Sequence, residues 1–199
     1  MSKIDIKITS SKFELIRDKI AYILADELAN QAILHKDNLF CADVWVERFI
    51  PFGHIDLPAI NVFYQRTTFE QQTPVTNEGE HYYNIDFHLK AESKSYEVGD
   101  KISSLNLHKL IGVSRAILEH PYYIYLDFGN NFGIANTHVT DIKIAEPERR
   151  TDGLHLISGR IIFKVRCNEF NEQLEGLPSE GFDTQIKLNE TDKGYKIVI

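Results

Sequence analysis

The chain has 199 residues and carries 22 lysines and arginines against 29 aspartates and glutamates, a net charge of −7. This length suits one well-formed core, and an acidic chain without a basic block is a poor match for a nucleic-acid-binding protein, which needs clustered Lys and Arg. The two cysteines, Cys41 and Cys167, form no CxxC pair, which excludes a disulfide framework and a cysteine-ligated zinc site.

The first third of the chain predicts one helix and two strands. Ser11 and Glu14 have the spacing of a capping box, and over residues 13–30 apolar side chains recur every three or four positions, as on one face of a helix. Residues 40–49 and 59–64 are rich in β-branched and aromatic side chains. They therefore predict two strands.

Residues 81–91 give the clearest strand signal, because apolar and polar side chains alternate along them. Such alternation is typical of a half-buried antiparallel sheet. The polar segment 68–80 before it is predicted as a long loop. A second amphipathic helix is expected over residues 100–119, and residues 122–126 predict a short strand.

Two more strands are expected at residues 137–145 and 155–170, with a charged hairpin tip between them. Short strand patterns at 184–188 and 195–199 predict a terminal hairpin.

The elements together predict an α+β fold, a mixed or antiparallel sheet packed against two helices, with a C-terminal β-hairpin extension. We expect a domain over residues 1–170 and the β extension of the same domain over residues 171–199.

The sequence holds no motif of a known catalytic or metal site. The helical histidine pair of a zinc protease, the GxSxG turn and the Walker A loop are absent. His54 and Asp56 share a loop, but two ligands do not make a metal site. Asp86 and His88 share a strand face and suit an acid–base pair of a hydrolase, although a solvated or subunit-facing strand is the simpler interpretation. We expect no enzyme activity and no cofactor.

Aromatic residues outnumber the places on the expected inward faces. Aromatic surface is enriched at protein interfaces, so we expect part of this set to face other subunits. The aromatic residues concerned are Tyr82, Phe52, Tyr64, Phe69, Tyr122 and Phe170. The basic pair Arg149-Arg150 in the charged hairpin tip suits docking to an acidic surface of a partner. We take Arg149, Arg150, Tyr82 and Phe52 as the candidate interface residues.

Five segments together carry a resemblance to a known family. They are a Leu-Pro-Ala-Ile-Asn-Val-Phe-Tyr strand at 57–64, the alternating strand 82–89, Val-Thr-Asp-Ile-Lys-Ile at 139–144, the Arg-Arg-Thr-Asp-Gly loop at 149–153 and a last strand at 159–167. In this order, between and after two helices, they resemble the tail terminators (minor tail proteins) of lambda-like long-tailed phages.

The resemblance covers residues 10–170 and implies a function. Such subunits form a hexameric ring that caps the tail tube, ends its polymerisation and offers the surface that docks to the head. The implied partners are further copies of the chain, the tail-tube protein and a head-completion or neck protein. Arg149 and Arg150 are then expected to point toward a neighbouring subunit or the tube.

The implied location is the virion tail after assembly in the host cytoplasm. This agrees with a chain that has no apolar run long enough to span a bilayer and whose first residues lack the apolar segment of a signal peptide. We expect no membrane partner and no nucleic-acid specificity. The alternative that the residues leave open is a small ligand-binding or regulatory α+β module of bacterial origin, with a concave apolar pocket and a few convergent polar groups.

Overall fold

The main sheet has the strand order β1-β2-β3-β6-β4, with the short strand β5 also paired to β6. Strand β1 runs parallel to β2, and the other pairings are antiparallel. The strand bounds are β1 Asp43–Val46, β2 Ala59–Gln71, β3 Thr76–Glu92, β4 Ile134–Ile144, β5 Glu148–Arg149 and β6 Leu154–Phe170. The prediction of an α+β fold with a mixed sheet and two helices is confirmed.

The computed structural model describes residues 10–50, 52, 57–71, 76–92, 96–129, 132–145, 148–149, 154–170, 184–186 and 195–197. Residues 9–170 form one compact unit, to which the main sheet and both helices belong. Residues 171–199 belong to a second unit, in which β7 (Thr184–Ile186) and β8 (Tyr195–Ile197) form a two-stranded antiparallel sheet. That residues 171–199 extend the same domain stays a prediction.

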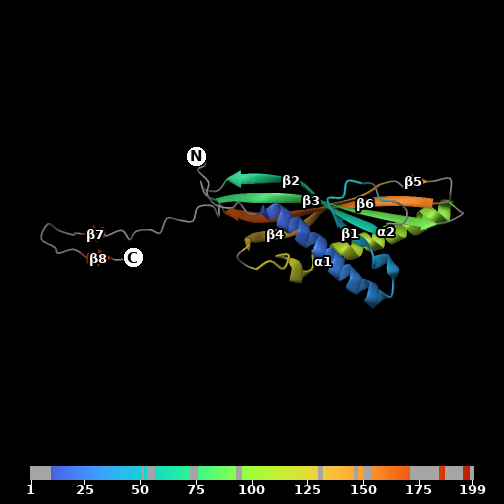
Figure 1. Cartoon of the computed structure of the whole chain (residues 1–199), viewed down its shortest axis with the longest axis horizontal. Coiled ribbons are helices and arrows are strands. Elements are labelled where there is room, and N and C mark those ends of the chain that lie inside the picture. Colours follow the sequence, from blue (N-terminus) through green and yellow to red (C-terminus); the bar gives the residue numbers. More distant parts are fainter. Residues whose placement is uncertain are drawn as a thin grey trace. The chain divides into compact units, whose positions relative to one another are not determined.

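Helices α1 (Lys12–His35) and α2 (Tyr96–Leu118) lie on the same face of the main sheet (Figure 1). The alternation in β3 and β6 accounts for this arrangement, because every second side chain of both strands points to the helices and is buried. These inner-face residues include Tyr83, Ile85, Phe87, Leu89, Ile157, Ile161, Phe163 and Val165. Each such apolar side chain contributes about 1.5–3 kcal/mol of transfer free energy when it is buried, so this layer holds the unit together.

Helix α1 begins with the capping box that the sequence predicts. The backbone N–H of Ser11 donates to the Glu14 carboxylate at 3.1 Å. The helix continues past the expected end at residue 30 and stops at His35, where Lys36 takes a left-handed conformation with φ 52°. The Tyr83 hydroxyl donates to the carbonyl of Phe13 at 2.9 Å, which fixes the first turn of the helix to the middle of the sheet.

Gly159 lets helix α2 approach the sheet closely. A Cβ atom at this position would stand 2.7 Å from the Cδ1 atom of Ile111 and 3.3 Å from a Cδ atom of Leu107. The ladder pairs Gly159 in register with Phe87, so the residue does not form the bulge that a glycine in a strand commonly marks. Its role is to leave room for the helix.

Two local predictions are wrong. Residues 122–126 form no strand but the 3-10 helix η3 (Pro121–Tyr123) followed by turns, because Pro121 favours a helical first turn and the His120 ring accepts a hydrogen bond from the N–H of Tyr122 at 3.2 Å. Most of the expected loop 68–80 is strand, since β2 runs to Gln71 and β3 begins at Thr76. Long-range pairing of β3 with β6 outweighs the polar composition there.

The expected strand at 40–49 is also shorter than predicted. Residues 38–40 form the 3-10 helix η1 (Asn38–Phe40), and β1 covers only Asp43–Val46. Phe40 is fully buried as part of the hydrophobic core and contacts His35 of α1 and Lys109 of α2 instead of pairing in the sheet. Neither helix of the described part of the chain has the length and apolar character needed to cross a membrane.

Candidate functional site

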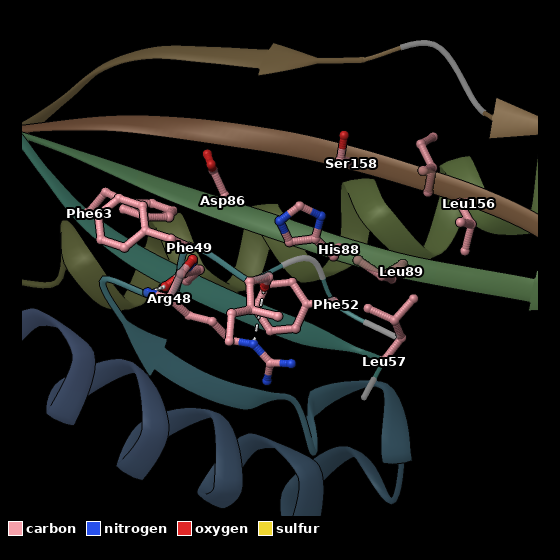
Figure 2. Close-up of a pocket in the computed structure, with 13 residues that line it drawn as sticks. Arg48, Phe49, Phe52, Leu57, Phe63, Asp86, His88, Leu89, Leu156 and Ser158 are labelled. Carbon is pink, nitrogen blue, oxygen red and sulfur yellow. Dashed lines mark hydrogen bonds between the residues drawn. The ribbon is translucent and has the colours of Figure 1, made fainter. Parts of the chain in front are cut away.

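The face of the sheet opposite the helices, here called the outer face, carries a pocket of about 500 Å3. Strands β2, β3 and β6 form its floor, and the chain after β1 forms a side wall with Arg48, Phe49 and Phe52 (Figure 2). Asp86 and His88 reach the pocket from β3 (Figure 2). We call this the outer-face pocket.

The side wall is placed by Asn61, a buried amide on β2. Its side-chain NH₂ donates to the Arg48 carbonyl at 2.7 Å, and its side-chain oxygen accepts from the Arg48 N–H at 3.1 Å. Glu47 precedes this contact in a left-handed conformation, φ 51°, and its carboxylate accepts from the Tyr64 N–H at 2.8 Å. These bonds satisfy both polar groups of the buried Asn61 amide and fix the position of the chain directly after β1.

A stack of flat side chains follows from that placement. The Arg48 guanidinium lies 4.4 Å from the centres of both the Trp45 and the Phe52 rings, a cation–π contact with each of two rings that stand edge to face. The Phe52 ring also contacts the His88 ring, with ring centres 4.9 Å apart. Phe52 therefore joins the wall of the pocket to its floor.

Asp86 faces Arg160 across β3 and β6, where the two residues are directly paired. The Nε atom of Arg160 donates to one carboxylate oxygen at 2.5 Å and an Nη atom donates to the other at 2.8 Å. This two-pronged ion pair raises the pKa of the Arg160 guanidinium, chiefly through the hydrogen bonds to Asp86. Both oxygens of Asp86 are thus bound to Arg160, which is not the acid–base arrangement with His88 that a hydrolase would need.

His88 lies directly opposite Ser158 in the same ladder. Burial lowers the pKa of the His88 imidazole, an effect to which Arg160 adds and which Asp86 opposes. The ring is therefore neutral at neutral pH and presents one donor and one acceptor nitrogen. His88 and Ser158 also line a neighbouring hollow of about 380 Å3 that extends to Lys143 on β4.

The structure does not bring the predicted interface residues together on one surface. Phe52 lines the outer-face pocket. Tyr82 lies half-buried in the central part of the same strand as His88, with Arg66 and Lys164 at 4.8 and 5.9 Å from its ring centre. Arg149 pairs through its backbone with His155 as part of β5, while its side chain and all of Arg150 lie outside the described residues. The loop pair His54 and Asp56 also lies outside them.

The expected exposure of the six aromatic residues is mixed. Phe69 and Tyr122 are exposed, as the aromatic surplus indicates. Tyr64, Tyr82 and Phe52 are only partly exposed, and the side chain of Phe170 lies outside the described ones. Sequence reasoning missed Arg48 and Arg160, although the position of Arg48 between Trp45 and Phe52 is a usable signal for a stacked cation.

Exposed apolar side chains lie on the chain that follows β1 and near β4, the two end strands of the main sheet. Val46, Phe49 and Ile50 are here called the β1 patch; Phe49 is 82% and Ile50 74% exposed, and both also line the outer-face pocket. Four exposed residues near β4 are called the β4 patch. Its members are Ile124, Tyr125, Ile142 and Ile144. The Thr137 hydroxyl donates to the Ile124 carbonyl at 3.2 Å, which ties the segment after η3 to this strand.

A second hollow of about 620 Å3 lies on the helical side and is lined by α1, α2 and residues 120–123. The Tyr123 hydroxyl donates a short hydrogen bond to the Glu27 carboxylate at its wall. This bond raises the pKa of the Tyr123 hydroxyl. The remaining lining is mainly apolar, with Val113, Ala116 and Ile117 from α2.

No protein-family model matches the chain, and no curated protein is significantly similar to it in sequence. The fold and the outer face therefore define its class by themselves. It is an α+β protein with two helices on one face of a mixed sheet, and with a pocket and two apolar edge patches that the helices leave uncovered.

Proposed function

We propose that this chain is a structural subunit of a phage tail, a tail terminator that forms a hexameric ring, caps the tail tube, ends its polymerisation and offers the head-docking surface. The proposal follows from the sequence resemblance over residues 10–170. The observation that supports it best is the presence of two different sets of exposed apolar side chains, one on and after β1 and one near β4, the end strands of the sheet.

A ring requires a heterologous contact, in which two different surfaces of neighbouring subunits meet. Strands β1 and β4 are the first and last strands along the sheet, and the two patches are made of different residues, one set on and after β1 and the other near β4. Joining the β1 patch of one copy to the β4 patch of the next leaves both patches covered only when the ring closes. A two-fold dimer would instead use one patch twice.

The assembly state tests the first part of the proposal. Light scattering after size exclusion, with negative-stain images of the same fractions, should show rings with a central hole. The double substitution Phe49→Ser with Ile50→Ser removes the β1 patch, and Tyr125→Ser with Ile144→Ser removes the β4 patch. Each variant should be monomeric. The control Leu105→Ser changes an exposed apolar residue of α2 and should leave the rings intact.

Mixing the two variants separates a ring from a dimer. Each retains the patch that the other lacks, so an equimolar mixture should give one-to-one heterodimers and no larger species. If loss of only one of the two patches abolishes assembly, the contact is two-fold and the proposal of a ring is contradicted. If both variants assemble like the unmodified chain, the edge patches are not the interface.

The tube-capping role needs its own assay. Tail-tube protein that polymerises in the presence of this chain should give shorter tubes, with rings at their ends in negative stain. The two patch variants should not shorten the tubes. A chain that remains monomeric and does not bind purified tail-tube protein would contradict the terminator function.

The outer-face pocket favours a second candidate, a small ligand-binding or regulatory module. Its volume of about 500 Å3 is within the roughly 300–1,000 Å3 common for ligand sites. Its lining combines apolar side chains with a few polar groups, which is the composition expected of such sites. This candidate predicts a monomer or simple dimer that binds a small molecule with one-to-one stoichiometry.

A further inference from the structure

Two polar side chains of the outer-face pocket have no hydrogen-bond partner in the described part of the chain: His88 and Ser158. The other polar lining groups are engaged differently. The Asn61 amide is bonded to the Arg48 backbone at both ends, and both Asp86 oxygens are bonded to Arg160. His88 and Ser158 are therefore the groups that a bound molecule would meet first as hydrogen-bond partners.

The ladder places these two side chains side by side. His88 and Ser158 are direct partners in the β3–β6 pairing, so both side chains project from the outer face. The Phe52 ring lies 4.9 Å from the His88 ring, and Figure 2 shows the two rings next to each other in the pocket. Phe49 and Phe63 add two more rings to the lining, 5.6 Å apart. His88 and Ser158 thus lie among aromatic rings, which are flat and apolar.

Charge on the ligand would be poorly matched. Asp86 is already neutralised by Arg160, and the Arg48 guanidinium contacts two rings and donates from Nε to the Ile50 carbonyl at 3.3 Å. An ionised ligand would lose hydration on entry and would have to compete with these existing contacts. A neutral imidazole offers one donor and one acceptor, and a hydroxyl offers one donor and two acceptor lone pairs, so both can pair with the N–H and C=O groups of an amide.

We propose that the outer-face pocket binds a flat, uncharged, largely apolar molecule that carries an amide group, with His88 and Ser158 as its hydrogen-bonding anchors. This inference rests on the second candidate function, ligand binding. The class of ligand it names is a neutral aromatic amide. Its flat ring lies among Phe49, Phe52 and Phe63.

Three small probes of nearly equal shape test the charge of the ligand: benzamide, benzoate and benzamidine. The chain has a single tryptophan, Trp45, whose ring centre is 6.5 Å from that of Phe52. Its one indole N–H signal in a ¹H–¹⁵N spectrum therefore reports on the pocket without further assignment. Benzamide should shift this signal in a saturable way, and the two charged probes should bind at least about tenfold more weakly, since they lose hydration without gaining an ion pair.

Two substitutions test the anchors. His88→Leu and Ser158→Ala should each weaken benzamide binding by about three- to tenfold, the loss expected for one hydrogen bond. The control His108→Leu changes an exposed histidine of α2 and should not affect binding. The dispersion of the NMR spectra shows whether each variant is folded. The two anchors lie on different strands, so if one variant does not fold, the other still tests the proposal.

The pH dependence gives a further readout. The charged or titratable groups facing His88 are Asp86 on the same strand, Arg160 on β6, Arg48 in the side wall and Lys143 on β4. Burial lowers the pKa of His88, so the neutral ring persists to below its ordinary pH range. On lowering the pH from about 8 to about 5, protonation removes the acceptor nitrogen. Benzamide affinity should then fall, and benzoate affinity should rise.

The outcomes are distinguishable. Benzoate or benzamidine binding more tightly than benzamide at neutral pH would overturn the uncharged ligand class but leave ligand binding as a function. No shift of the Trp45 signal with any of the three probes would overturn both this inference and the second candidate function. Benzamide binding that is unchanged in both anchor variants would overturn the roles of His88 and Ser158.

Discussion

Asp86 and Arg160 form a two-pronged ion pair across the centre of the outer face, with distances of 2.5 and 2.8 Å between the paired atoms. Asp86 is largely buried, whereas the Arg160 side chain is partly open to solvent. Asp86 raises the pKa of His88, whereas Arg160 lowers it. Burial is the main cause of the lowered pKa of His88, and the pair modulates this pKa as well as joining two strands.

Arg160→Met should raise the pKa of His88. The substitution removes a positive charge that lowers this pKa and leaves Asp86, which raises it, without its partner. NMR titration of the His88 ring signals measures the change. Because Asp86 is largely buried, leaving its carboxylate without Arg160 should lower the free energy of unfolding by about 1–3 kcal/mol. Arg115→Met, which breaks an exposed pair with Glu119 on α2, is the control, and an unchanged or lower His88 pKa in Arg160→Met would contradict the prediction.

Two glycine substitutions should have opposite effects on stability. Gly159→Ala places a Cβ atom 2.7 Å from Ile111 and should lower the free energy of unfolding by about 1–3 kcal/mol through overpacking. Gly112→Ala, on α2, meets nothing within 4 Å and should raise it by roughly 0.5–1 kcal/mol, because alanine favours the helix. Urea unfolding curves measure both.

A double-mutant cycle identifies the contact responsible. Ile111→Val removes the Cδ1 atom that the new methyl group would meet, so Gly159→Ala should cost less in that background than in the unmodified chain. An equal cost in both backgrounds would show that the strand backbone, and not the helix, resists the added methyl group.

Thr67→Val should destabilise the β2–β3 hairpin where Thr67 pairs with His81. The Thr67 hydroxyl lies 2.7 Å from Nδ1 of the fully buried His81 and accepts from the Tyr64 hydroxyl at 2.9 Å. Losing it leaves a buried ring nitrogen without this partner, which typically costs about 1–3 kcal/mol. The control Thr68→Val changes an exposed neighbour and should alter stability by less than about 0.5 kcal/mol. Equal effects in thermal unfolding would exclude a role for the buried network.

The two thiols should react at very different rates. Cys41 is exposed, whereas Cys167 is buried and burial raises its pKa to about 11. The thiolate is the reactive species, so at neutral pH a thiol reagent should modify one cysteine of the native chain quickly and the second only after unfolding. Mass spectrometry of the labelled peptides measures this. Rapid labelling of Cys167 in the native chain would mean that β6 opens locally.

Local sequence patterns identified both helices and the central strands of the sheet. The alternation through residues 81–91 identifies β3 and also separates Tyr83, Ile85 and Phe87 from Asp86 and His88, because successive side chains of a strand point to opposite faces. The capping box at Ser11 marks the start of α1. The pattern failed at residues 122–126, where aromatic composition suggests a strand but a proline and a histidine cap produce a 3-10 turn.

The sequence by itself determined the class of fold, the faces of the central strands and the chemistry available on them. Only the tertiary structure decided that β6 inserts between β3 and β4, so that Ser158 stands opposite His88 and Arg160 opposite Asp86. It also decided that the chain after β1 folds over the outer face and sets Phe52 on His88. The physical reason is that periodicity depends on near neighbours along the chain, whereas register and strand order depend on contacts between residues some seventy positions apart, which a local pattern does not encode.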